Sequence, residues 1–198
     1  MKRPIQEMPL RFSRPKLEVA LAQLLKRYPL HPKYSCLCLT HSLKAKKPKE
    51  RIYDGAGPLF DRKKQQFMRD PLEFTLFNRE FEDLYLYEVY KKVCAWSPLR
   101  IGRVRVFLRN PGTCLHMHTD DSPRYHIAIS TNSGSYFFFE KAGAFHIPAN
   151  GRLYKADTTE LHTVFNAGET SRVHMIFDTI EWRFLPKRSR RRVVRSDI

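Results

Sequence analysis

Two histidines and one aspartate in the second half of the chain have the residue types and spacing of a metal site. His118 and Asp120 are separated by a single residue, so on an extended strand both side chains leave the same face. His162, farther along the chain, can complete a set of two imidazoles and one carboxylate. That set is the facial triad of non-haem Fe(II) centres, which leaves coordination positions open for other ligands. The pattern therefore predicts that these three residues bind Fe(II).

Arg172 adds a cation that suits a carboxylate ligand. A guanidinium is planar and permanently charged, and it can hold a carboxylate through two parallel hydrogen bonds. An iron with open positions beside such an arginine indicates 2-oxoglutarate as co-substrate, together with O2. His-x-Asp alone is a weak signal in a chain with eight histidines, and the order of the whole set makes it specific. The sequence therefore predicts a dioxygenase.

The motifs around these residues resemble those of the aspartyl/asparaginyl β-hydroxylase family. The chain reads Pro-Gly-Thr-Cys-Leu-His-Met-His at 111–118 and Arg-Tyr-His-Ile at 124–127, followed by His162 and, ten residues later, Arg172. The resemblance covers roughly residues 101–184. It implies a double-stranded β-helix that uses Fe(II), 2-oxoglutarate and O2.

The resemblance also implies roles for individual residues. The family histidines that match His118 and His162 bind iron, and the arginine that matches Arg172 holds the distal carboxylate of 2-oxoglutarate. The histidine of the Arg-x-His motif, here His126, helps to hold the co-substrate. The arginine of that motif, here Arg124, faces the substrate.

The chain departs from the animal members of that family at two positions. Those enzymes have Gly where this chain has Asp120, so the triad is complete here, as in the resembling bacterial amino-acid hydroxylases. A family serine that assists the co-substrate falls near Phe107 in this chain. The identity of the substrate therefore does not follow from the resemblance.

Several polar residues near the motifs have two interpretations each. Arg109 and Asn132 are expected to line the mouth of the site, where Arg109 would hold a substrate carboxylate; a surface role is the alternative. His174 shares the inward face of its strand with Arg172 and is expected to contact co-substrate or substrate. His116 is either an alternative ligand or a polar neighbour of the metal site.

The elements that position these residues are predicted to be short strands. From residue 101 onward β-forming residues dominate and turn residues recur at short intervals. The pattern predicts a mainly β fold with flanking N-terminal helices, in the form of a cupin-like jelly roll or double-stranded β-helix. Such a barrel brings ligands from non-adjacent strands to one mouth. The expected strands are 103–108, 114–118, 125–130, 135–140, 144–147, 152–156, 161–165 and 173–178.

The first hundred residues have a different pattern. Residues 17–28 show apolar positions at helical spacing, and Pro29 is expected to end that helix. Residues 44–49 are rich in lysine and predict an exposed loop. Residues 78–95 predict a second helix, whose aromatic face would pack against a sheet.

We predict three parts: a basic, helix-containing region at 1–100 that packs on the barrel, a catalytic core at 101–184, and a basic tail at 185–198. The net charge of +16 is concentrated at the two ends. Residues 1–51 carry +10 and the tail carries +5. The basic ends are therefore expected to contact an acidic or nucleoprotein partner, and a solvated tail is the alternative.

Composition favours a folded, non-membrane protein. Hydrophobic residues make up 42% of the 198 residues, and 14 are Phe. No apolar run approaches the roughly 18 residues of a membrane span. The start of the chain lacks the apolar segment of a secretion signal, and its four cysteines lack paired zinc spacing. The expected location is the cytoplasm, with reduced thiols.

The predicted reaction is hydroxylation of an unactivated C–H bond in an amino acid or an amino-acid side chain. Succinate and CO2 would be the co-products, and ascorbate would support the iron. The substrate is left open between a free amino acid and a protein side chain of Asp/Asn or Pro type. Two alternatives are non-enzymatic: a cupin-like metal-binding protein and a basic nucleic-acid-binding protein.

Overall fold

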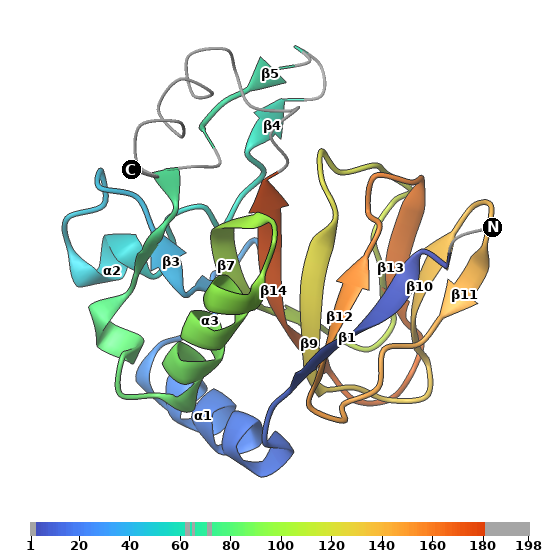
Figure 1. The fold of residues 1–198 in the computed structure, drawn as a ribbon, viewed down its shortest axis with the longest axis horizontal. Coiled ribbons are helices and arrows are strands. Elements are labelled where there is room, and N and C mark those ends of the chain that lie inside the picture. Colours follow the sequence, from blue (N-terminus) through green and yellow to red (C-terminus); the bar gives the residue numbers. More distant parts are fainter. Residues whose placement is uncertain (1–2, 62–63, 65, 71–72, 181–198) are drawn as a thin grey trace.

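The computed structural model describes residues 3–61, 64, 66–70 and 73–180 and shows two antiparallel sheets (Figure 1). The large sheet has the strand order β1-β12-β9-β14-β7-β2, and the small sheet has the order β11-β10-β13-β8. The strands of the large sheet are β1 (Ile5–Arg11), β2 (Cys36–Cys38), β7 (Arg100–Arg109), β9 (Arg124–Ser130), β12 (Arg152–Ala156) and β14 (Arg172–Ile180). Those of the small sheet are β8 (Thr113–Cys114), β10 (Ser135–Phe139), β11 (Gly143–Phe145) and β13 (His162–Asn166).

An apolar core between the sheets holds them face to face. Ala128 and Tyr154 of the large sheet pack in one cluster with Phe137 and Val164 of the small sheet. Aromatic and branched residues on facing strands are the usual filling of such a core. The predicted jelly roll, a double-stranded β-helix, is confirmed.

The strands predicted after residue 101 all occur, although some are shorter than predicted: β11 ends at Phe145 and not at residue 147, and β8 differs most. β8 ends at Cys114, whereas the sequence predicted a strand over 114–118. Beyond it the chain is irregular until a single β-bridge joins His118 to His162. The strand prediction for 115–118 was therefore wrong.

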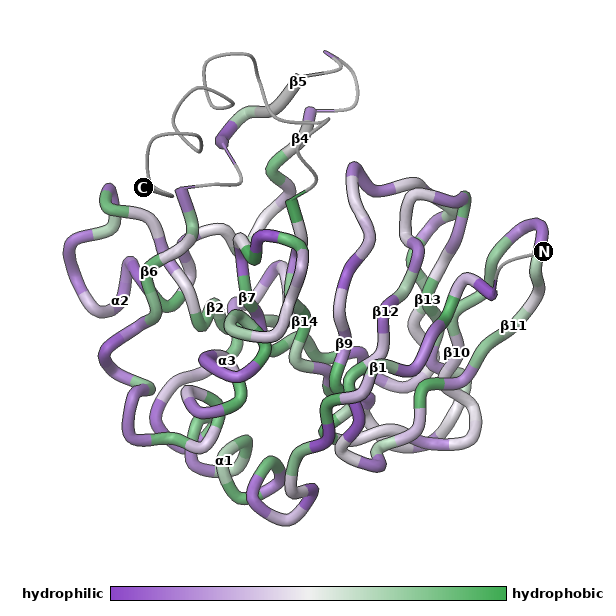
Figure 2. Tube along the Cα trace, in the orientation of Figure 1, coloured by the Kyte–Doolittle hydropathy of each residue, from purple (hydrophilic) through white to green (hydrophobic). Residues whose placement is uncertain are grey.

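Two helices cover the outer face of the large sheet. They are α1 (Arg14–Arg27) and α3 (Tyr85–Trp96), and their buried side chains share one cluster with Val104 of β7 and Met175 of β14. Hydrophilic and hydrophobic residues alternate along α1 in Figure 2, as expected of a helix with one face on a sheet. The prediction for 17–28 is confirmed, with a start three residues earlier.

The second helix is shorter than the range of residues 78–95 that the sequence predicted. Residues 79–81 form a 3-10 turn, η2 (Arg79–Phe81), and α3 begins only at Tyr85. The side-chain amide of Asn78 donates hydrogen bonds to the carbonyl oxygens of Cys38 and Arg51. This tie holds the preceding backbone in an extended conformation that cannot continue as a helix.

The region 1–100 contributes strands as well as helices. β1 pairs with β12 and β2 pairs with β7, so both extend the large sheet. The sequence did not predict these strands. A short helix, α2 (Pro48–Arg51), occurs where a loop was expected at 44–49. The remaining elements are the short strands β3 (Thr40–His41), β4 (Phe60–Asp61), β5 (Gln66–Phe67) and β6 (Leu76–Phe77).

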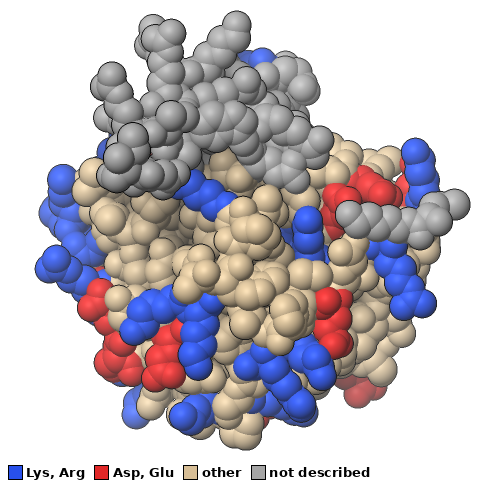
Figure 3. Space-filling view, viewed as in Figure 1, with Lys and Arg blue, Asp and Glu red and all other residues tan. Residues whose placement is uncertain are grey.

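The excess of basic residues is visible on the surface. Figure 3 shows Lys and Arg side chains gathered over the part of the face where α1 and α2 lie. The basic tail predicted at 185–198 lies outside the described residues. Within the described part of the chain, no helix is long and apolar enough to cross a membrane.

The two central strands present alternate residues to the two sides of the sheet. Val104 and Val106 of β7 point to the helices, and the arginines at 103, 105 and 109 line a cavity on the other side. On β14, Arg172 lies directly opposite Arg109. The pleat of these strands therefore determines which side chains reach the cavity.

Candidate active site

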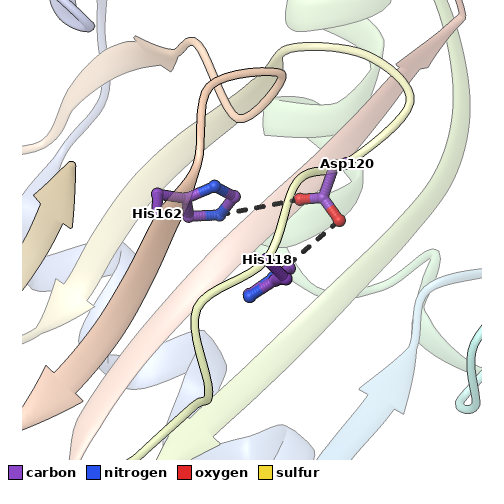
Figure 4. A group of neighbouring side chains, drawn as sticks. All are labelled: His118, Asp120 and His162. Atoms are coloured by element: carbon purple, nitrogen blue, oxygen red, sulfur yellow. Dashed lines mark ion pairs between the residues drawn. The ribbon is translucent and has the colours of Figure 1, made fainter. Parts of the chain in front are cut away.

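His118, Asp120 and His162 converge as predicted (Figure 4). Their metal-binding atoms all lie within 4.8 Å of one another. Asp120 stands between the two imidazoles, with its carboxylate oxygens 3.9 Å from Nε2 of His118 and 3.8 Å from Nε2 of His162. The cluster joins the loop after β8 to the start of β13.

The sequence predicted that a regular strand would position His118 and Asp120. In the structure, backbone hydrogen bonds position all three residues of the cluster. The amide of His118 donates to the carbonyl oxygen of His162, and the amide of His162 donates back, both at 2.8 Å. The amide of Asp120 donates to the carbonyl oxygen of Thr158 at 2.7 Å. The convergence of His118 and Asp120 therefore comes from this bridge and not from strand alternation.

The protonation of the two imidazoles fits a bound cation. Nδ1 of His118 lies 2.8 Å from the carbonyl oxygen of His116, and Nδ1 of His162 lies 2.8 Å from that of Glu160. A carbonyl oxygen only accepts, so each neutral ring carries its proton on Nδ1 and has a lone pair on Nε2. Burial lowers the pKa of His162 and favours this neutral form.

The carboxylate of Asp120 completes a cluster of electron-pair donors. Its Oδ2 is buried and has no hydrogen-bond partner in the described part of the chain. Three lone-pair donors that face one another with no proton between them repel one another unless a cation lies among them. Two histidines and one carboxylate are the ligands of non-haem Fe(II). His118, Asp120 and His162 thus fit an iron ion.

Arg124 holds the metal-binding aspartate in place. Its guanidinium lies 3.0 Å from Oδ1 of Asp120 and 3.2 Å from Oδ1 of Asp178. Burial works against its charge, but the two carboxylates raise the pKa of Arg124. The resemblance implied that this arginine faces the substrate. It does line the cavity, but its guanidinium is engaged with two carboxylates.

Arg172 is a buried cation with no anionic partner among the described residues. It is 3% exposed, and no carboxylate of those residues lies within ion-pair distance of it. Its guanidinium lies 5.1 Å from the ring centre of Phe137 and donates a hydrogen bond of 2.9 Å to Nδ1 of His174. Burial, with a further contribution from Arg109, lowers the pKa of Arg172 to about 9. A carboxylate ligand would offset this cost, so Arg172 fits 2-oxoglutarate.

His126 has the properties of a second ligand-binding group. It is buried, it lines the cavity, and neither of its ring nitrogens has a hydrogen-bond partner in the described structure. Burial, together with Arg172, holds the pKa of His126 well below its ordinary value, so the ring is neutral. A neutral imidazole can donate one hydrogen bond and accept another from a ligand.

These groups share one cavity of about 400 Å³ between the two sheets. The candidate metal ligands His118 and His162 lie on its wall together with Arg124, and other predicted residues, Arg109 and Arg172, do so too. Residues 33–35 and 56–58 of the N-terminal region close another side. The volume is in the usual range of small-molecule sites.

Three predicted site residues are not among those that line the cavity: Asp120, whose carboxylate lies between the two imidazoles of the metal cluster, Asn132 and His174. The side-chain amide of Asn132 binds Asn166, Thr170 and the backbone amide of Gly134, so it stabilises a turn, and its predicted contact with substrate stays a prediction. His174 is fully buried beside Arg172 and accepts its hydrogen bond. It therefore positions the arginine and has no surface on the cavity.

A buried charge network next to the iron ligands was not predicted. Asp178 accepts a hydrogen bond of 2.8 Å from Nε of Arg103, and it also pairs with Arg105 and Arg124. Burial alone would raise the pKa of Asp178, but the three guanidiniums hold it well below its ordinary value. Charged residues at alternate positions, 103 and 105 on one strand and 172 and 178 on the other, were the available signal.

Replacing Asp178 with asparagine should lower the free energy of unfolding by about 3–5 kcal/mol at pH 7, because three buried guanidiniums lose their shared carboxylate. A carboxylate with a depressed pKa contributes its stability above the unfolded-state value of about 4 and loses it as the pH falls below that. The difference in free energy of unfolding between wild type and Asp178→Asn should therefore become smaller at acid pH. Urea denaturation at several pH values measures both effects.

The matched control is Asp83→Asn, which removes a carboxylate that pairs with Arg27 on the surface. It should change stability little, since exposed ion pairs contribute little. Equal losses in Asp83→Asn and Asp178→Asn would contradict a special role for the buried network.

The fold and the site together define a class. Facing sheets of a double-stranded β-helix, a His-x-Asp…His cluster and a buried arginine over one cavity are those of a 2-oxoglutarate-dependent dioxygenase. Residues 85–181, just under half of the chain, match the family described as aspartyl/asparaginyl β-hydroxylase. The match confirms the family and the hydroxylase class that the motifs predicted. No curated protein sequence matches the chain.

Solved structures with a similar fold support the architecture. An oxidoreductase of the 2OG-Fe(II) oxygenase family from Burkholderia pseudomallei aligns with a TM-score of 0.56 at 14% identity, over 88% of this chain and 82% of that one. AviO1 from Streptomyces viridochromogenes aligns with a TM-score of 0.52 at 11% identity, over 92% and 91%. The collagen prolyl hydroxylase of Paramecium Bursaria Chlorella virus-1 aligns with a TM-score of 0.50 at 10% identity, over 90% and 91%.

Proposed function

We propose that this protein hydroxylates an unactivated C–H bond of an amino acid or an amino-acid side chain, with 2-oxoglutarate and O2 as co-substrates. The proposal rests on one cavity whose surrounding groups fit two ligands of opposite charge. Its cluster of lone-pair donors requires a cation, and its buried Arg172 requires a carboxylate. A 2-oxoglutarate molecule bound to iron meets both requirements.

Iron(II), when bound, would supply the coupled activation of O2 and oxidative decarboxylation of 2-oxoglutarate to succinate and CO2, which inserts one oxygen atom into the substrate. The protein's own groups position and shield the reactants. Arg124 holds the carboxylate of Asp120, and Arg172 would bind the distal carboxylate of the co-substrate. His126 would hydrogen-bond the co-substrate from the neutral ring.

The test of this function is succinate release from 2-oxoglutarate with Fe(II) and ascorbate, across a panel of amino acids and peptides of Asp, Asn and Pro type. We expect succinate to rise above the uncoupled rate with one member, which would gain the mass of one oxygen atom. A protein that binds iron but never consumes 2-oxoglutarate would contradict the proposal and favour a non-enzymatic metal-binding protein. That alternative gives no reason for Arg172 to be buried in the cavity without a carboxylate partner among the described residues.

The basic ends are proposed to serve partner capture and not chemistry. Exposed charges more than about 10 Å from the iron are largely screened at 0.1 M salt. Deletion of residues 187–198 should therefore leave uncoupled 2-oxoglutarate turnover unchanged. If the substrate is an acidic or nucleoprotein partner, the deletion should weaken its binding and flatten the salt dependence of that binding. Loss of iron binding in the truncated protein would contradict this division of roles.

A further inference from the structure

One strand presents a line of cationic and aromatic side chains to the cavity. Arg103, Arg105, Phe107 and Arg109 alternate along β7, and all four line the cavity. The iron ligands and Arg172 come from other elements. The positive charges of this strand therefore need an explanation of their own.

The first of these arginines is fully engaged by the protein. Arg103 donates from Nε to Asp178, and its NH1 donates to the carbonyl oxygens of Gly55 and Gly57 at 2.5 and 2.6 Å. It ties β7 to the loop that closes the cavity. Its role is structural, and it leaves no donor that calls for a ligand.

The other two arginines are not engaged in this way. Nε of Arg105 and Nε of Arg109 are both buried and lack a hydrogen-bond partner in the described structure. Arg105 reaches Asp178 only at 3.5 Å, and that carboxylate already binds two other guanidiniums. Arg109 has no carboxylate of the described residues within ion-pair distance. Arg105 is buried with one long ion pair, and Arg109 is half-buried with none, so both guanidiniums are incompletely paired and fit an anionic ligand.

Arg109 and Arg172 are opposite each other on the sheet but turn to different walls. The guanidinium of Arg172 lies over Phe137 of the small sheet, at 5.1 Å. That of Arg109 lies over Phe107 of its own strand, at 4.9 Å, and the guanidinium of Arg105 lies 5.9 Å from the same ring. The cavity therefore has two cationic positions, one at the ring of Phe137 and a second at the ring of Phe107.

2-Oxoglutarate does not balance the charge of the second position. Its distal carboxylate pairs with Arg172, and its other end would lie on the metal with Asp120. This leaves Arg105 with one long contact, to Asp178 at 3.5 Å, and it leaves Arg109 and Lys33, which also line the cavity, without a carboxylate partner among the described residues. A second anion in the cavity would complete the pairing of these groups, and for this enzyme that molecule is the substrate.

We propose that Arg105 and Arg109, on either side of Phe107 and with Lys33 nearby, form an oxyanion subsite that selects a substrate bearing a carboxylate or phosphate group. The proposal rests on the proposed function, since it assigns the remaining space of the same cavity. Lys33 and the loop at 56–58 lie outside residues 85–181, so the part of the chain that the family match does not cover contributes to this wall. The substrate's anion lies here while its reacting carbon faces the metal cluster.

The test measures the binding of matched anionic and neutral probes while the metal site and the 2-oxoglutarate site are filled. Protein is loaded with Zn(II), a redox-inert replacement for Fe(II), and with N-oxalylglycine, which occupies the 2-oxoglutarate position. Calorimetry then compares O-phosphoserine with serine, and aspartate with asparagine. We expect the anionic member of at least one pair to bind about tenfold or more tightly, because charge-assisted bonds to guanidinium are strong. The pair that shows the difference identifies the anion as phosphate or carboxylate.

Arg105→Met and Arg109→Met should each remove that preference and leave binding of Zn(II) and N-oxalylglycine within about twofold. The matched control is Arg100→Met, at the exposed start of the same strand, which should behave as wild type. Equal binding within both pairs in wild-type protein, or a preference that survives both cavity substitutions, overturns the subsite. Failure of the wild-type protein to bind Zn(II) and N-oxalylglycine would instead refute the proposed function, and the probe comparison can still be made without them.

Discussion

Replacing His118 or His162 with alanine should abolish iron binding and 2-oxoglutarate turnover together. Each ring supplies one of three donors, and its Nδ1 is already committed to a backbone carbonyl, so neither ring can turn to compensate. Loss of residues that only support a ligand costs about ten- to hundredfold in metal affinity, and loss of a ligand itself should exceed about hundredfold. Titration of the apo protein with Fe(II) under anaerobic conditions, followed by succinate release, measures both.

His146→Ala is the matched control for these substitutions. This histidine also binds a backbone carbonyl through Nδ1, that of Ser135, but it lies outside the metal cluster. Its replacement should leave Fe(II) affinity unchanged. Full Fe(II) affinity in both His118→Ala and His162→Ala would refute the assignment of the metal site.

Asp120→Ala separates this chain from the animal enzymes that its motifs resemble, which have Gly at this position. Here the carboxylate both supplies Oδ2 to the cluster and pairs with Arg124 through Oδ1. Its removal leaves a buried guanidinium with one partner fewer, so we expect Fe(II) affinity and turnover to fall by about tenfold or more. Wild-type activity in this variant would show that two histidines suffice in this protein as well.

The metal cluster could be predicted from the sequence because its chemistry depends on residue type. Few combinations of side chains bind Fe(II) and leave positions open, so the types and order of His118, Asp120 and His162 were enough to identify them. The route by which they meet could not be predicted. His118 follows an irregular segment, and the bridge to His162 that positions it is a long-range backbone contact with no local sequence signal.

Strands after residue 101 could be predicted because turn residues separate them at short intervals. β1 and β2 could not be, since an edge strand and a three-residue strand have weak periodicity and gain their order from pairing with β12 and β7. The dependence on long-range contacts also explains why the role of Asn132 in a turn could not be predicted. Its residue type suits a cavity as well as a turn, and only the folded backbone places its partners around it.

The buried charges around the cavity connect fold and function. Asp178 pairs with Arg103 and Arg124 and so contributes to the fold, whereas it reaches Arg105 only at 3.5 Å, and Arg172 and Arg109 have no carboxylate partner among the described residues. Natural proteins rarely bury unpaired charge, because it costs several kcal/mol of stability. In this molecule the uncompensated guanidiniums face the cavity, where ligands can supply the missing anions.

Replacing Arg172 with methionine should raise the apparent KM for 2-oxoglutarate by about hundredfold or more. A buried guanidinium–carboxylate pair that loses one partner costs about 3–5 kcal/mol, and each ~1.4 kcal/mol is tenfold in affinity. Fe(II) affinity should change by less than about threefold, because Arg172 is not one of the metal-binding residues. Succinate release against 2-oxoglutarate concentration and anaerobic Fe(II) titration measure the two quantities.

The same substitution should not weaken the fold of the ligand-free protein. Without co-substrate, Arg172 is a buried cation whose contacts in the described structure are His174 and the ring of Phe137, so an apolar side chain of similar length removes a cost. We therefore expect Arg172→Met to keep or raise the melting temperature of apo protein while 2-oxoglutarate no longer stabilises it. Arg109→Met is the matched control and should leave the KM for 2-oxoglutarate unchanged. If Arg109→Met raises that KM and Arg172→Met does not, the two arginines have exchanged roles, and both the co-substrate assignment and the separate oxyanion subsite are wrong.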